Sequence, residues 1–253
     1  MDRAGFPHEI LDDTAHRPWP MPRGPWLMTQ TWNDLLFAHW PVEQQALRER
    51  VPAGFEVDLF DGHAWVAVVP FRMTNVAPRL VPALPWISAF PELNVRTYVT
   101  VNGKPGVYFF SLDAGNPLAV AAARTLLILP YYTAKMDVRV AGDGRVQDDC
   151  QRTSEPSAAF AAHYGGGGEP HSPAPGTLEY FLTERYCLYA VDHSRHAYRL
   201  EIHHPAWRLE HGTGEIAVNT MADAAGLPLP DIAPLLHFAK RQDMVCWAPE
   251  RIG

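Results

Sequence analysis

The chain has few lysines and cysteines, and it has no long apolar run. Of its 21 basic residues only Lys104, Lys135 and Lys240 are lysines, so a reaction that needs an amine has three candidates. The three cysteines lie far apart, which excludes a CxxC metal pair and a disulfide framework and fits a reducing compartment. No run of about 18 apolar residues occurs, so we expect no transmembrane helix and no membrane partner.

Positive charge is also scarce. The formal net charge is −7, which argues against a nucleic-acid partner bound through a basic surface. The N-terminal stretch has no apolar core of a secretory signal, so the sequence predicts a cytoplasmic protein. Hydrophobic residues make up 47% of the chain, enough for a large core.

The remaining pattern predicts one β-dominated α+β domain. Residues 1–25, rich in proline and charge, are expected to form an irregular arm, and residues 26–253 a single domain. Short alternating runs separated by turn signals outnumber helical patterns. We expect hairpins over 55–73, 92–114 and 131–153, turning at Asp61-Gly62, Asn102-Gly103 and Asp143-Gly144. Helices are expected over 42–51, 116–129, 178–186 and 218–227, the second capped by Asn116 and started by Pro117.

Two segments are predicted to be loops. The proline-rich run 76–90 is incompatible with a central strand and is a good candidate for a cavity rim. The run 165–176 begins GGGG and is expected to be flexible, but it lacks the Lys-Ser/Thr of a phosphate-binding loop. No motif indicates a cofactor.

One strand, FPELNVRTYV at 90–99, carries an unusual polar face. Alternation places Glu92, Asn94, Arg96 and Tyr98 together, opposite an apolar row. Such a face is often solvated. The partner strand VYFFSLD is apolar on both faces, however, which is typical of a strand deep in a sheet, and internal charges must be paired or functional. We therefore expect this row to line an internal cavity.

A second polar row follows in YYTAKMDVRV. Here Tyr131 and Lys135 share a face with Thr133, Asp137 and Arg139. This face is either an ordinary solvated one, or it surrounds the Lys135 amine and lowers its pKa so that the amine can form a Schiff base. The twelve histidines include neighbours at 203 and 204, but chance clustering explains them and we expect no metal site.

Several motifs together resemble the bacterial family DUF2071, the YqjF-like proteins, from about Trp32 to Ile252. The motifs are WNDLLFAHWPV, FEVDLFDGHAWVAVVPFRM, FPELNVRTYV, GVYFFSLDA, AARTLLILPYY and WAPERI. The family is grouped with the acetoacetate-decarboxylase-like superfamily. The resemblance implies an antiparallel closed or cone-shaped β-barrel with flanking short helices and an internal pocket.

The resemblance also limits the chemistry. Enzymes of the superfamily use paired lysines after an aromatic–proline step, whereas Tyr131 and Tyr132 follow Pro130 here, and a phenol forms no imine. The resemblance implies that Glu92 occupies the position of a pocket carboxylate of the family. Arg96 would then either pair with Glu92 or bind an anionic ligand with two hydrogen bonds. Arg124 is a further candidate ligand-binding residue, or a structural one.

Three functions stay open. The first is a pocket that binds a small molecule without lysine chemistry, lined by Glu92, Asn94, Arg96, Tyr98 and Tyr131, with Tyr132 and Arg124 nearby. The second is a lyase or hydrolase on a small oxo acid that uses Lys135 or Glu92; a raised pKa of Glu92 would favour it. The third is a non-enzymatic interaction protein, such as a homo-oligomer that uses tryptophan-rich loops, which an exposed apolar patch would favour.

Overall fold

The computed structural model describes residues 6–81, 83 and 87–252. Its strands are β1 (Met28–Val42), β2 (Glu56–Val57), β3 (Ala64–Pro78), β4 (Phe90–Val101), β5 (Lys104–Ala114), β6 (Tyr131–Val140), β7 (Val146–Arg152), β8 (Ala159–His171), β9 (Cys187–Val191), β10 (Ala197–His203), β11 (Leu209–Asn219), β12 (Leu235–Cys246) and β13 (Glu250–Ile252). Its helices are the 3-10 helix η1 (His8–Leu11) and α1 (Gln44–Arg48), α2 (Pro117–Leu126), α3 (Leu178–Thr183) and α4 (Met221–Ala224).

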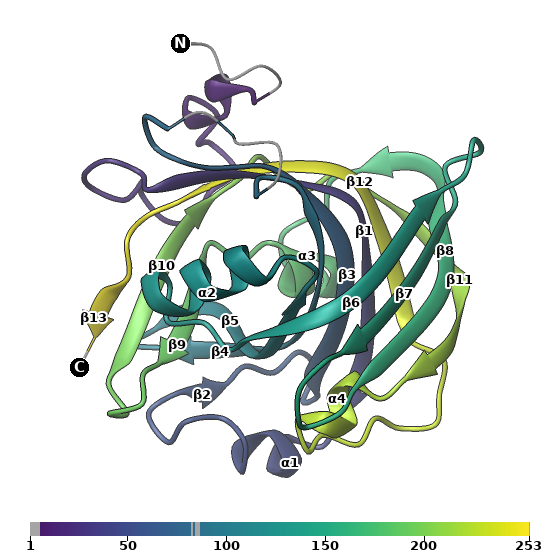
Figure 1. Ribbon diagram of the computed structural model, residues 1–253. Coiled ribbons are helices and arrows are strands. Elements are labelled where there is room, and N and C mark those ends of the chain that lie inside the picture. The colour runs from purple at the N-terminus through teal and green to yellow at the C-terminus, as the bar shows by residue number, and fades with distance from the viewer. Residues whose placement is uncertain (1–5, 82, 84–86, 253) are drawn as a thin grey trace.

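The strands form one strongly curved sheet in the order β13-β10-β9-β5-β6-β7-β8-β11-β12-β1-β3-β4-β2 (Figure 1). The β-dominated fold with a few short helices is confirmed. Two additional pairings, β4 with β5 and β10 with β12, join strands that are distant in this order. The sheet is not wholly antiparallel, because β5 pairs parallel with both β6 and β9.

Strand β5 is central, as its two apolar faces predicted. It pairs with β4 on one side and with β6 and β9 on the other. Helix α2 makes the crossover between the parallel strands β5 and β6, and Asn116 caps it by accepting bonds from the amides of Leu118 and Ala119. The helices α2 and α3 supply Val120 and Leu182 to one core cluster with β5, and both lie within the curve of the strands in Figure 1.

The predicted hairpin over 55–73 is wrong in its pairing. Asp61 and Gly62 both have positive φ, as a type I′ turn requires, but only the bridge between Phe60 and His63 forms there. The short β2 pairs with β4 instead, because an edge of β4 is available to it. The hairpins β4–β5 and β6–β7 form as predicted.

The glycine run is part of a strand, so the predicted flexible loop is wrong at 165–171. Strand β8 continues through the glycines and pairs with β11. A Cβ atom built on Gly166 would overlap Glu210 and Phe238, and one on Gly214 would overlap the backbone of His163 and Tyr164. At Gly166 and Gly214 glycine is therefore required by the close approach of neighbouring atoms.

The proline-rich run is shorter as a loop than predicted. Strand β3 extends to Pro78 and β4 begins at Phe90, while residues 82 and 84–86 of the predicted rim lie outside the described residues. Residues 6–27 are mostly irregular, and Phe6 and Ile10 of this arm pack on Val245 and Trp247. No helix in the described part of the chain is long and apolar enough to cross a membrane.

Candidate functional site

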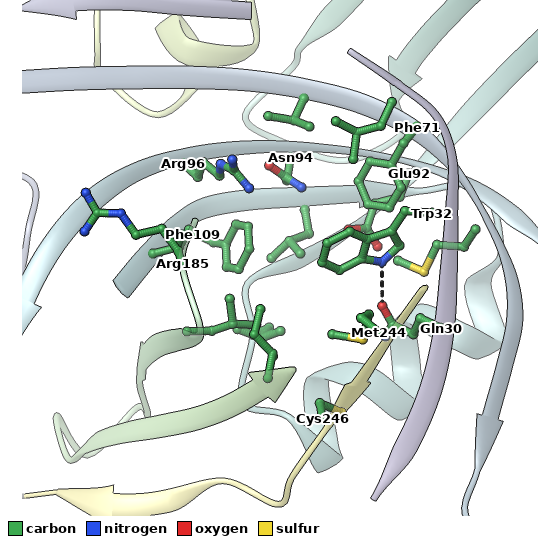
Figure 2. A pocket seen from close by; sticks show the side chains of 18 of the residues that line it. Gln30, Trp32, Phe71, Glu92, Asn94, Arg96, Phe109, Arg185, Met244 and Cys246 are labelled. Carbon is green, nitrogen blue, oxygen red and sulfur yellow. Dashed lines mark hydrogen bonds between the residues drawn. The ribbon is translucent and has the colours of Figure 1, made fainter. Parts of the chain in front are cut away.

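An enclosed cavity of about 60 Å³ lies between the curved sheet and the ends of α2 and α3. Most of its wall is apolar, and its polar side chains gather at two ends. Figure 2 shows Glu92, Trp32 and Gln30 close together at one end and Arg96 and Arg185 at the other. Of the predicted polar row of β4, Glu92, Asn94 and Arg96 thus line an internal space, whereas Tyr98 is buried but does not line the cavity. A volume of this size has room for a few water molecules or a small organic group.

Glu92 is a buried carboxyl group with little compensation for a negative charge. Its exposed fraction is 2%, and Oε2 has no hydrogen-bond partner among the described protein atoms. Burial is the main cause that raises the pKa of Glu92 to about 8, and the nearby carboxylate of Asp113 raises this pKa further. Hydrogen bonds to Tyr131 and Asn94 act in the opposite direction and lower it. The carboxyl group is therefore mostly protonated at neutral pH and has a proton to donate.

Arg96 is a buried cation without a carboxylate partner among the described residues. It is 8% exposed, Nε has no hydrogen-bond partner in the described part, and a terminal nitrogen contacts the carbonyl oxygen of Leu182 at 3.4 Å. Its guanidinium lies 5.0 Å from the ring centroid of Phe37 and 5.7 Å from that of Tyr98. The raised pKa of Glu92 argues against the Glu92–Arg96 pair considered above, which would have lowered that pKa.

Tyr98 and His39 support Arg96 from behind. The Tyr98 hydroxyl lies 2.6 Å from Nε2 of His39, and both side chains are fully buried. Burial lowers the pKa of His39 well below its usual value, and the charge of Arg96 lowers it further, so the imidazole is neutral. Nε2 can then accept a hydrogen bond from the Tyr98 hydroxyl, whose oxygen in turn accepts one from Arg96.

The second arginine of the cavity, Arg185, is neutralised. Its Nη1 atom lies 2.6 Å from Oδ2 of Asp58, and Nε donates to the carbonyl oxygen of Phe181 at 2.7 Å. Arg185 thus has a carboxylate partner, whereas Arg96 has none among the described residues. A fully buried pair behind Glu92, Arg152 with Asp113, is joined by two bonds of 2.7 Å.

Sequence reasoning did not identify Arg185, Gln30 or Trp32 as cavity residues. Gln30 accepts a hydrogen bond from the Trp32 indole at 2.9 Å (Figure 2), and both lie on β1. The alternation of β1 gives the one available signal, because it places these polar and aromatic side chains two residues apart on the same face. Arg185 follows α3 and carries no comparable pattern.

The other predicted site residues are divided among separate places. Tyr131 lies in the cavity wall beside Glu92. Tyr132 and Arg124 face a more open hollow of about 500 Å³ that also borders Asp192 and His193. Arg124 donates to the carbonyl oxygen of Tyr131 at 2.6 Å, which favours its structural reading.

The lysines all lie outside the lining of the enclosed cavity. Lys135 is exposed on β6, since only the first residues of that strand pair with β5 and the rest pair with β7 away from the cavity. Lys104 is partly buried, and its amine lies 2.6 Å from Oε1 of Glu201. Lys240 pairs with Asp34. The structure does not bring Lys135 together with Glu92.

The histidines near residue 203 hold the N-terminal arm. His203 contacts the carbonyl oxygen of Ile10 at 2.6 Å, and His16 contacts that of His204 at 2.8 Å. Over the described ranges, no three His, Cys, Asp or Glu residues converge in a way that could hold a metal ion.

The sequence pattern of the DUF2071 family, described as an uncharacterised conserved protein, matches residues 29–243. This chain belongs to the DUF2071 family. Its relatives include the protein YqjF of Bacillus subtilis (strain 168), which is 48% identical over 227 residues, or 90% of this chain and 93% of that protein.

Solved structures show the same fold at low sequence identity. Acetoacetate decarboxylase from Legionella pneumophila aligns over 100% of this chain and 98% of its own, with a TM-score of 0.64 and 16% identity. The enduracididine biosynthesis enzyme MppR, in complex with pyruvate, aligns over 93% of each chain with a TM-score of 0.62 and 10% identity. The DUF2071 chain therefore has an acetoacetate-decarboxylase-like fold.

Proposed function

We propose that this DUF2071 protein binds a small anionic organic molecule in the enclosed cavity of a cone-shaped barrel. One observation carries the proposal: Arg96, a buried guanidinium without a carboxylate partner among the described residues, lines the same cavity as the protonated Glu92. An unpaired buried charge is costly, and a carboxylate bound to it by two parallel hydrogen bonds would offset that cost.

The two ends of the cavity suit different parts of such a ligand. Arg96 would bind the carboxylate, and the protonated Glu92 would donate a hydrogen bond to a carbonyl or hydroxyl oxygen. Asn94 lies between them on β4, with an Oδ1 atom that no described residue contacts by a hydrogen bond. Pyruvate, found with the structural relative MppR, is an oxo acid of this class and supports it.

The binding test compares short carboxylic and oxo acids in isothermal titration calorimetry. We expect Arg96→Gln to weaken binding at least tenfold, in line with the strength of charge-assisted hydrogen bonds. Arg139→Gln is the matched control, because the Arg139 side chain is 70% exposed on β6. Equal affinities for both variants would refute the role of Arg96.

A second candidate is a lyase or related enzyme that moves a proton with Glu92. It is favoured by the pKa of Glu92 of about 8 and by the adjacent Tyr131 phenol, which could stabilise an enolate. Imine chemistry has less support, since every lysine lies outside the cavity lining.

Deuterium exchange next to the carbonyl of an oxo acid tests this candidate by NMR. Proton removal needs the ionised carboxylate, so we expect the exchange rate to rise with pH up to about 8 and then level off. Glu92→Gln should abolish exchange while the acid still binds. Exchange that persists in this variant would exclude Glu92 as the base.

A further inference from the structure

A second hollow, the apolar chamber, lies beside the enclosed cavity. It measures about 240 Å³, four times the volume of its neighbour. Its wall includes Val76 and Phe90 from β3 and β4, and Leu118, Ala119 and Ala123 from α2. Gln30 and Tyr131 are its only lining residues with a polar side chain among those described. Such a space suits hydrocarbon rather than a charged group.

The chamber and the cavity share one wall. Gln30, Met73, Leu127 and Tyr131 line both spaces. Gln30 crosses the wall, since its Oε1 atom accepts from Trp32 on the cavity side and its Nε2 atom lies 3.5 Å from the sulfur of Met28 on the chamber side. Met73 and Leu127 are flexible aliphatic side chains without hydrogen bonds to break, so changes of rotamer can open this wall.

The surface around the chamber is apolar as well. Leu118 and Leu126 on α2 are 70% and 59% exposed, and Ile87 is 37% exposed; all three line the chamber. Leu80 and Val81, at 92% and 42%, follow the end of β3. Grouped exposed side chains of this kind are typical of a site that receives an apolar partner. Continuity with the cavity points to the ligand of that cavity as this partner.

We propose that the ligand is an amphipathic acid whose hydrocarbon tail occupies the apolar chamber. This inference rests on the proposed function, because Arg96 holds the head group. The polar row from Arg96 to Glu92 spans roughly 13 Å between Cα atoms along β4. An elongated acid lies along this row, passes between Met73 and Leu127, and ends beneath α2.

A chain-length series tests the inference with straight-chain carboxylic and 2-oxo acids of three to ten carbons, titrated by calorimetry. We expect affinity to rise about three- to fourfold for each methylene that enters the chamber, the factor that corresponds to burying one CH2 group. Ala123→Phe, which fills the chamber, should remove this rise while the shortest acids still bind. Ala121→Phe is the matched control, since Ala121 is exposed on the same helix and does not line the chamber. Ala119→Leu is a milder second blocking variant if Ala123→Phe unfolds.

The outcomes separate the two proposals. A flat chain-length profile with binding that still depends on Arg96 overturns the tail site and leaves the proposed function standing. Equal loss of long-chain binding in Ala121→Phe and Ala123→Phe also overturns the tail site. Binding of no acid at any length overturns the proposed function and the inference with it.

Discussion

Replacing Glu92 by glutamine should change how stability depends on pH. The Glu92 carboxyl group has a pKa of about 8 in the fold and one near 4.5 as its ordinary value. Between these two values the native state binds more protons than the unfolded chain at this site. Stability of the wild type therefore falls as pH rises from about 4.5 to 8, and it levels off above. Glutamine has nearly the same shape and no charge, so Glu92→Gln lacks this contribution.

The expected size follows from the linkage relation. Each pKa unit corresponds to about 1.4 kcal/mol of unfolding free energy. Ionisation of Glu92 therefore lowers the free energy of unfolding of the wild type by about 5 kcal/mol above pH 9 and by about 3 kcal/mol at pH 7. Near pH 4.5 the variant should have little advantage. Asp148, another buried carboxyl whose pKa burial raises to about 7, contributes with the same sign in both proteins and cancels from the difference.

Urea unfolding followed by tryptophan fluorescence from pH 4.5 to 9 measures this difference. The free energy of unfolding of Glu92→Gln relative to wild type should rise steadily with pH. Exposed Glu215→Gln on β11 is the control and should give a nearly constant difference. Parallel profiles for wild type and Glu92→Gln would show that Glu92 is ionised in the fold and would refute the account of a dry, uncompensated carboxyl group.

Three further predictions concern the scaffold and are measured by the same unfolding assay. Arg152→Met should destabilise the fold by about 3–5 kcal/mol, because it leaves the fully buried Asp113 without its partner. Gly214→Ala should cost about 1–3 kcal/mol, since the new methyl group overlaps the β8 backbone, whereas Gly142→Ala, with open space around it, should be nearly neutral. Asn116→Ala should cost about 1 kcal/mol through loss of the α2 cap; no change in any of the three would contradict these contacts.

Local signals in the sequence predicted much of the scaffold correctly. The type I′ turn at Asn102-Gly103 and the cap of α2 form because they depend on neighbours in the chain. The GGGG run misled because it lies within strand β8, where Gly166 leaves room for side chains of β11 and β12 that are distant in sequence. Likewise, Asp61-Gly62 turns as predicted, yet the partner of β2 was decided by an available edge of β4.

The same division holds for the site. By itself the sequence determined that Glu92, Asn94 and Arg96 share one face of a strand and that tyrosines, not lysines, directly follow Pro130, since strand alternation and residue order are local properties. Only the tertiary structure decided that this face lines a cavity, that Arg185 has a carboxylate partner while Arg96 has none in the described part of the chain, and that Lys135 lies outside the cavity. Those outcomes depend on which distant strands close around the row, and burial of a charge is a property of the assembled sheet.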